Sequence, residues 1–275
     1  MSYATLMVHM EPGRPNTGLL KVTAELAERF GAGVIGVAVR QPMQMLYGDG
    51  YVSGDVYQQD RDEIVKELKA AEAEFRGALE GRVAFVEWRS AQLYAYLAGY
   101  LADEARCADL VLTGLASGDF LDASRNVNTG ELIMLAGRPV LIVPAAASTL
   151  KLDRVLVGWK DTREARRAVA DALPLLKLAT QVKVVEIARE EDLAAAGQHV
   201  ADVVAWLKRH RIEAEGKALL STGDDATALY ASGQDQGADV VVAGAYGHSR
   251  LREWALGGVT RDLLLSANRC SFLSH

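Results

Sequence analysis

The chain has 275 residues, of which 50% are hydrophobic and 24% charged, and its formal net charge at pH 7 is −6. This balance is typical of a globular protein long enough for two domains. The acidic balance without a basic stripe argues against a nucleic-acid partner, and no apolar stretch approaches the ~18 residues of a membrane span. The two cysteines form no C-x-x-C pair and the first residues have no signal-peptide pattern, so we expect a cytoplasmic protein with reduced thiols.

The first half of the chain alternates apolar runs with stretches of helical spacing. Strands are predicted at residues 4–10, 34–39, 83–88, 109–113 and 139–143. Between the second and third strands, residues 41–60 are rich in Tyr, Met and Gly and have no clear period. We interpret them as a long loop, either a surface excursion packed on its own side chains or a lid or interface element.

The second half repeats this alternation. Strands are predicted at 154–158, 182–187, 214–220, 239–243 and 270–274, and helices at about 163–178, 193–210, 225–236 and 259–267. Between the halves, Ala145–Lys151 follows Pro144, and we interpret this segment as a short interdomain linker.

The two halves also resemble each other in sequence. Ala108–Gly114 matches Ala238–Gly244 at an offset of 130 residues, and Leu6–Met10 matches Val155–Trp159 at an offset of 149. The offsets differ by 19 residues, which locates an insertion in the first half near residues 41–60. Continuous runs of Val, Leu and Ile suit parallel strands covered on both faces by helices. We therefore predict two doubly wound five-stranded α/β domains, at residues 1–147 and 152–275.

A glycine-patterned loop follows the fourth strand of the second half. Glycines at 244 and 247 allow tight turns and close approach to a ligand, and glycines at 257 and 258 leave backbone N–H groups bare where a helix is predicted to begin. In an open α/β sheet this crevice outside the carboxyl ends of the strands is where ligands bind. The loop therefore predicts an anion or phosphate site, although an ordinary strand-to-helix turn would show the same glycines. The candidate site residues are Gly158, Lys160, Asp161, Gly244, Gly247, His248, Ser249, Arg250, Gly257, Gly258, Val259 and Thr260.

The spacing G-x2-G-x9-G at Gly244, Gly247 and Gly257 resembles the ATP-binding motif of the universal stress proteins. The strand at Arg154–Trp159, the strand that follows Arg269 and, in the first half, Gly137–Val140 also resemble this family. The resemblance implies the adenine-nucleotide α-hydrolase-like fold in each half, with a parallel sheet of order 3-2-1-4-5. It also implies that the two halves pair through their last strands.

The chain departs from the family pattern at two positions. Lys160 stands where ATP-binding members carry an Asp, with Asp161 one residue later, and Gly258 stands where the family usually has Ser or Thr. In the first half, Gly114 begins only part of the glycine turn, and Asp119 and Asp122 would repel a triphosphate. We therefore expect one nucleotide site, in the second half.

The leading functional hypothesis is a stress-response protein that binds ATP, with Mg²⁺ as an accompanying ion, and that shows at most weak ATP hydrolysis. We expect neither a nucleic-acid nor a membrane partner, and we leave open whether two copies form a homodimer. The alternative is a nucleotide-free interaction or scaffold module of the same family. A hydrolase on the same scaffold is the third and weakest interpretation, because the sequence shows no nucleophile elbow, Walker motif or metal-ligating histidine spacing.

Overall fold

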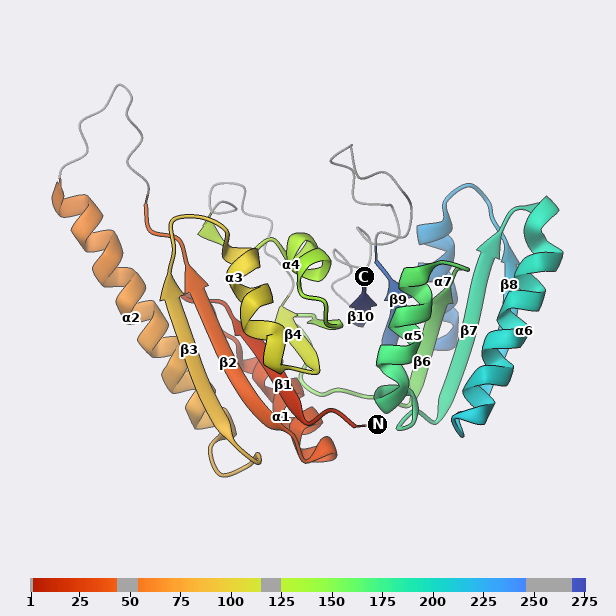
Figure 1. Ribbon diagram of the computed structural model, residues 1–275, viewed down its shortest axis with the longest axis horizontal. Helices are drawn as coiled ribbons and strands as arrows, with labels where there is room; N and C mark the ends of the chain where they lie inside the picture. Colours follow the sequence, from red (N-terminus) through yellow and green to blue (C-terminus); the bar gives the residue numbers. More distant parts are fainter. Residues whose placement is uncertain (1, 44–53, 115–124, 246–268) are drawn as a thin grey trace, which may run out of the picture.

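The computed structural model describes residues 2–43, 54–114, 125–245 and 269–275. Within these ranges the strands form one mixed ten-stranded sheet with the order β3-β2-β1-β4-β5-β10-β9-β6-β7-β8 (Figure 1). The first five strands are β1 (Thr5–Met10), β2 (Gly33–Arg40), β3 (Val86–Gln92), β4 (Leu110–Gly114) and β5 (Val140–Val143). The second five are β6 (Arg154–Trp159), β7 (Gln181–Ala188), β8 (Ala214–Leu220), β9 (Val240–Gly244) and β10 (Cys270–Ser274).

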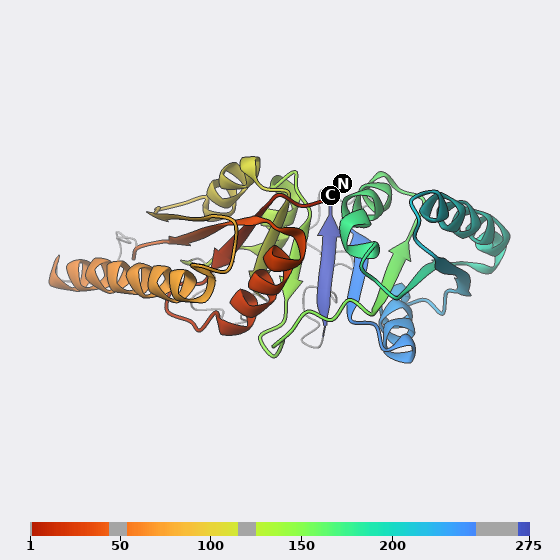
Figure 2. The same ribbon diagram turned by 90° about the horizontal axis from the view of Figure 1, so that it is seen from below.

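Each half of the sheet is parallel and has the order 3-2-1-4-5, as predicted. The halves join where β5 and β10 pair antiparallel, with Phe272 opposite Leu141. This confirms the expected pairing through the last strands, and β10 lies between the halves in Figure 2. The sheet twists, as β-sheets do, so β3 and β7, which lie far apart in the sheet, both point upward in Figure 1 despite the antiparallel junction.

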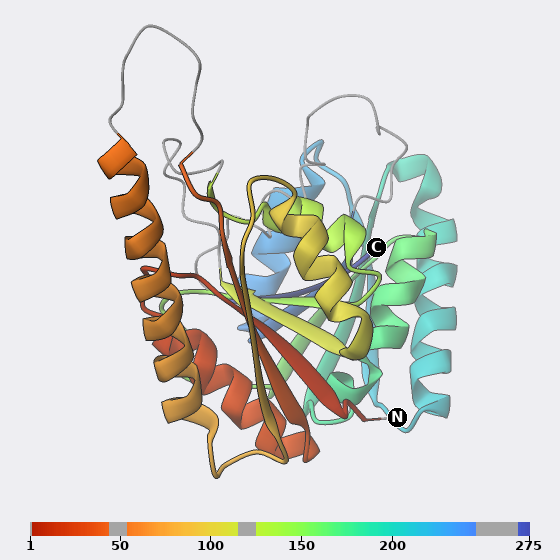
Figure 3. The same ribbon diagram turned by 60° about the vertical axis from the view of Figure 1, so that its left-hand side comes forward.

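Helices cover both faces of the sheet (Figure 3). One face carries α1 (Thr17–Phe30), α2 (Gly54–Leu79), α5 (Arg163–Leu176) and α6 (Leu193–Arg209). The other carries α3 (Leu97–Glu104), α4 (Thr129–Leu135) and α7 (Asp225–Gln236). Because both faces are covered, central strands are apolar throughout; Val155, Leu156 and Val157 of β6 are fully buried, and each such side chain stabilises the fold by about 1.5–3 kcal/mol.

The repeated Ala-Asp pair has a structural role in both halves. Asp109 accepts hydrogen bonds from the backbone N–H groups of Ala4 and Thr5 at 2.7 and 3.0 Å. Asp239 accepts one from the N–H of Arg154 at 2.9 Å. Each carboxylate thus satisfies amides at the start of the first strand of its half, which explains why this pair recurs at the start of the fourth strand.

Two boundaries differ from the sequence-based expectation. The third strand spans Val86–Gln92, shifted from the predicted 83–88, because this edge strand follows its full pairing with β2 and needs no continuous apolar run. Residues 54–60, predicted as loop, begin α2, which has 26 residues against 17 for α6. The insertion therefore lengthens a helix as well as the connection before it, and residues 44–53 of that connection lie outside the described ranges.

Contacts beyond the β5–β10 junction also hold the halves together. The Tyr3 hydroxyl donates to the backbone carbonyl of Asp171 on α5 at 2.6 Å, and burial raises the pKa of this tyrosine well above its usual range. The backbone N–H of Leu150, in the segment between β5 and β6, donates to Glu25 on α1 at 2.8 Å. No helix in the described ranges is long and apolar enough to cross a membrane.

Candidate functional site

The carboxyl ends of β6 and β9 lie side by side in the second half. Gly158 of β6 pairs with Ala243 of β9, so Lys160 and Asp161 follow one strand where Gly244 ends its neighbour. These are the first and fourth strands of a 3-2-1-4-5 sheet, between which the strand order reverses. The structure thus brings Gly158, Lys160, Asp161 and Gly244 to the crevice in which doubly wound folds bind ligands.

Both glycines at this crevice allow close packing by neighbouring helices. A Cβ added to Gly158 would lie 2.9 Å from Leu229 Cδ2 of α7. A Cβ added to Gly244 would lie 2.5 Å from the backbone nitrogen of Ala165 and 2.6 Å from the carbonyl carbon of Glu164, in the first turn of α5. Gly244 therefore sets how closely β9 approaches the N-terminus of α5.

Lys160 joins the loop after β6 to the first turn of α7. Its Nζ atom lies 3.8 Å from Asp225 Oδ2, and both side chains are partly exposed. Asp225 Oδ1 in turn accepts a hydrogen bond of 2.6 Å from the Ser221 hydroxyl, just after β8. Lys160 thus has an exposed carboxylate partner, which an incoming anion would have to displace or join.

Asp161 turns toward α5 instead. Its carboxylate pairs with Arg166 Nη2 at 2.5 Å, and both groups are about half exposed. The next residue, Thr162, caps α5 by accepting a hydrogen bond from the Ala165 N–H at 3.3 Å. Asp161 is therefore engaged by a cation of its own helix in this structure.

A buried carboxylate lies one strand further out. Glu186 on β7 is 5% exposed and sits beside Trp159 in the strand register. His199 Nδ1, on α6, lies 3.3 Å from Glu186 Oε2. Burial raises the pKa of Glu186, and the His199 hydrogen bond opposes that rise.

The remaining candidate residues lie outside the described ranges. They are Gly247, His248, Ser249, Arg250, Gly257, Gly258, Val259 and Thr260, together with the helix predicted at 259–267. Their assignment to the site stays a prediction from the sequence.

The corresponding crevice of the first half differs in its side chains. His9 and Thr113 take the places of Gly158 and Ala243, and His9 Nδ1 lies 3.0 Å from Thr113 Oγ1. His9 is 4% exposed, and burial lowers its pKa to about 4, so the ring is neutral. Glu11 follows β1 where Lys160 follows β6, so the charge at this position is reversed.

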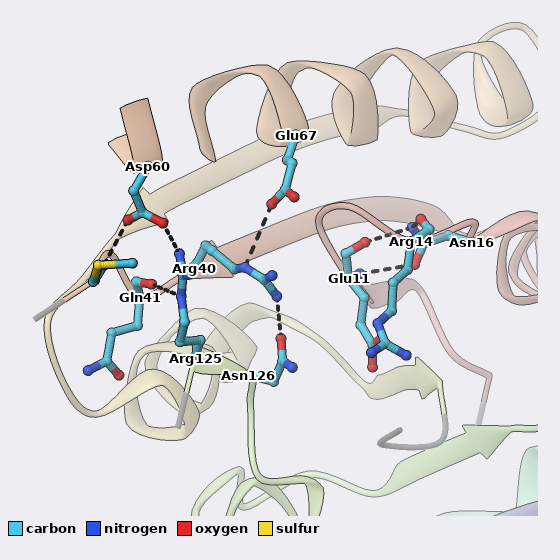
Figure 4. A network of polar contacts seen from close by, with 10 residues as sticks. Glu11, Arg14, Asn16, Arg40, Gln41, Asp60, Glu67, Arg125 and Asn126 are labelled. Atoms are coloured by element: carbon cyan, nitrogen blue, oxygen red, sulfur yellow. Dashed lines mark hydrogen bonds and ion pairs between the residues drawn. The ribbon is translucent and has the colours of Figure 1, made fainter. Parts of the chain in front are cut away.

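A polar network crosses the same edge of the first half (Figure 4). Arg40, at the end of β2, binds Asn126 at 2.5 Å and lies 3.7 Å from Glu67 of α2. Arg125 pairs with Asp60 of α2 at 2.6 Å and donates to the carbonyl of Gln41. These contacts tie the end of β2 to α2 and to the segment that precedes α4. The guanidinium groups of both arginines are thus paired with groups of the protein itself.

The sequence interpretation missed Asp225 and Ser221. Both follow β8, the third strand of the second half, and so lie at the same edge as Lys160. The rule that parallel strands end at one edge would have placed them there, but neither belongs to a motif. Among the described residues, no group of three or more His, Cys, Asp or Glu side chains could hold a metal ion.

Solved structures match the whole chain. A universal stress protein from Archaeoglobus fulgidus DSM 4304 superposes with a TM-score of 0.73 at 14% identity, covering 98% of this chain and 95% of that chain. The chain has the fold of a tandem universal stress protein. The likeness inferred from the glycine motif is thus confirmed at the level of the fold.

Two further structures share this tandem universal stress protein fold. A functionally unknown protein from Pseudomonas aeruginosa PAO1 has a TM-score of 0.62 at 14% identity, covering 99% of this chain and 92% of that one. The cytoplasmic domain of a prokaryotic cation chloride cotransporter has a TM-score of 0.54 at 13% identity, covering 98% and 94%. No family model matches the sequence, and no curated protein matches it.

Proposed function

We propose that the chain is a tandem universal stress protein that binds one adenine nucleotide, ATP, at the crevice of its second half. The observation that carries this proposal is the meeting of Lys160 and Gly244 where β6 and β9 end side by side. The rest of the glycine motif, from Gly247 to Thr260, follows directly from that point in the sequence. Backbone N–H groups of such a loop are suited to hold phosphates.

The charges of this crevice favour phosphate recognition by Lys160. Its ion pair with Asp225 is exposed and 3.8 Å long, so it contributes little stability and is readily exchanged for a phosphate oxygen. Lys160 therefore serves the phosphate end of the ligand in this proposal, and the family's nucleoside-binding carboxylate has its nearest counterpart in Asp161. Asp161 is held by Arg166 at the surface and can be released at small cost.

Mg²⁺ would reach the site with the nucleotide and be held mainly by phosphate oxygens. Magnesium commonly binds through one or two carboxylates together with substrate phosphates, and the exposed Asp161, next to Lys160, is the carboxylate that we propose for it. The ion would supply charge neutralisation for the phosphates. No catalytic constellation is assigned to these residues, so the proposal is binding with at most weak hydrolysis, in the cytoplasm.

The first half is proposed to have no nucleotide site. Its crevice holds the His9–Thr113 pair and Glu11, and a carboxylate at that position repels phosphate. The Arg40 and Arg125 contacts already link β2, α2 and the segment before α4 (Figure 4). This half would serve as the partner that completes the ten-stranded sheet.

Calorimetry with ATP tests the proposal. We expect one molecule of ATP per chain, and we expect Gly247→Val and Lys160→Gln each to weaken binding at least about ten-fold, since charge-assisted hydrogen bonds contribute roughly 1.5–3 kcal/mol. Lys151→Gln is the matched control, because Lys151 is an exposed lysine of the segment between the halves. Unchanged binding by both site variants would reject the assignment.

The second candidate is an interaction module that binds no nucleotide. The likeness to the cytoplasmic domain of a cation chloride cotransporter favours it, since in that protein the same fold forms one domain of a larger protein. Protein purified without adenine absorbance and without a thermal shift in millimolar ATP would decide for this candidate.

A further inference from the structure

The second half buries an ionisable pair beside the proposed nucleotide site. The Glu186 carboxylate is 5% exposed on β7, on the face that α6 covers. His199 Nδ1 lies 3.3 and 3.4 Å from its two oxygens and is the one side-chain group that the described residues place against it at hydrogen-bond distance. A buried carboxylate with one long hydrogen bond is costly to keep ionised.

The fold itself does not require this pair. In the register of the first half, Met10 pairs with Ala38, and these two fully buried apolar residues take the places of Trp159 and Glu186. The first half forms the same five-stranded sheet with them. The polar pair is thus a feature that the second half has in addition to its fold.

A further buried polar group lies beside this pair. The indole N–H of Trp159 is buried and has no hydrogen-bond acceptor among the described residues. Trp159 is the residue directly before Lys160, and a buried polar group without a partner in a native fold calls for an explanation, such as a bound water or ion or a functional role. Trp159 and Glu186 thus place two buried polar groups on neighbouring strands beside the crevice.

The electrostatic surroundings connect the pair to the proposed site. The charges that act on Glu186 are those of His199 from α6 and of Lys160 and Asp161 from the loop after β6. Further out, Arg166 of α5 pairs with Asp161 and Asp225 of α7 pairs with Lys160. On the other side β8 contributes the uncharged Ala218 in register with Glu186.

On α6 itself, Asp202 lies one turn beyond His199 and accepts a hydrogen bond from Gln198 at 3.0 Å. Its carboxylate is thus turned to a neighbour of its own helix. The charged groups that act on Glu186 are therefore His199 on α6 and the residues Lys160 and Asp161 of the loop after β6.

We propose that Glu186 and His199 form a protonation-sensitive pair that controls the affinity of the second-half site for a phosphate-bearing ligand. The inference rests on the proposed nucleotide site. In its deprotonated form the pair carries one negative charge next to the Lys160 loop and opposes an anionic ligand. Uptake of a proton makes the pair neutral, so ligand binding and proton uptake favour each other. Affinity for the phosphate-bearing ligand thus rises as pH falls.

The experiment measures ATP affinity by calorimetry at pH 6 and pH 8 in the full chain. We expect the ATP affinity of the wild-type protein to rise between pH 8 and pH 6 by roughly three- to ten-fold more than the affinity of His199→Gln. The factor is modest because a unit charge one strand away acts through a screened medium. The variant comparison is needed because phosphate groups themselves change charge near pH 6. Glu186→Gln should bind more tightly than the wild type at pH 8, because it lacks the negative charge of the pair.

His210→Gln is the matched control, because His210 caps the far end of α6 and packs against Trp206 at 4.4 Å between ring centroids. It should keep the wild-type pH dependence. Equal pH dependence in wild type and His199→Gln overturns the inference and leaves the nucleotide site standing. Absence of ATP binding at both pH values overturns the proposed function and the inference with it. If Glu186→Gln fails to fold, His199→Gln decides alone.

Discussion

Gly244→Ala is the substitution that most directly probes the geometry of the candidate site. The added Cβ would lie 2.5 Å from the Ala165 nitrogen and 2.6 Å from the Glu164 carbonyl carbon. Both are backbone atoms of α5, so no rotamer change relieves the overlap and the first turn of the helix must move. Overpacking of this kind costs about 1–3 kcal/mol. Movement of Ala165 also weakens its bond to the Thr162 cap, a contact of about 1 kcal/mol.

The matched control is Gly114→Ala, at the equivalent strand end of the first half. No atom of the described residues lies within 4 Å of a Cβ added there. Alanine should be neutral or slightly stabilising at this position, because it loses less chain entropy than glycine on folding. The two variants therefore differ in the packing of α5 and share the same chemical change.

Thermal denaturation of both variants gives the test. For a chain of this size, 1 kcal/mol shifts the Tm by roughly 2–4 °C, so Gly244→Ala should melt about 5–15 °C below the wild type. Gly114→Ala should melt within about 2 °C of the wild type. Equal melting temperatures of the two variants would refute the close approach of β9 to α5, and with it the described shape of the crevice.

Three further predictions concern single side chains. Burial lowers the pKa of His9 to about 4, so the unfolded chain binds the extra proton first; stability should be complete above pH 6.5 and fall as pH decreases toward 4, by on the order of 3 kcal/mol, and urea unfolding of His9→Gln should lack this loss. Asp225→Asn should free Lys160 and tighten ATP binding about two- to five-fold in calorimetry, since exposed ion pairs are worth at most about 1 kcal/mol; weaker binding would show that Asp225 contacts ligand or metal. Tyr3→Phe removes the hydrogen bond to the Asp171 carbonyl and should cost about 1–2 kcal/mol in urea unfolding, with an unchanged value arguing that this contact does not hold the halves together.

The sequence predicted the sheet well because the buried strands carry their own signal. Leu110–Gly114 and Val240–Gly244 are apolar on both faces, so a continuous run located them within a residue. The edge strand β3 is only partly buried, and its polar residues gave no such run; the apolar segment around Phe85 misled the prediction, although Phe85 itself is 45% exposed. The lengthened α2 was missed because its first turns are exposed and carry no apolar stripe.

The candidate site was predictable only where topology determines it. Lys160 and Gly244 lie at strand ends, so the order 3-2-1-4-5 brings them together. The partner of Lys160 was not predictable, since Asp225 lies 65 positions away and no local pattern links the two. The contact between Glu186 and His199 was equally unpredictable, because it depends on how α6 crosses β7.

Amide chemical-shift mapping of the full chain during titration with ATP tests the central claim most directly. We expect shifts at Gly158, Lys160, Asp161 and Gly244, with the amides of the first-half residues Glu11 and Gly114 unchanged. Shifts confined to the first half, or no shifts at millimolar ATP, would contradict it.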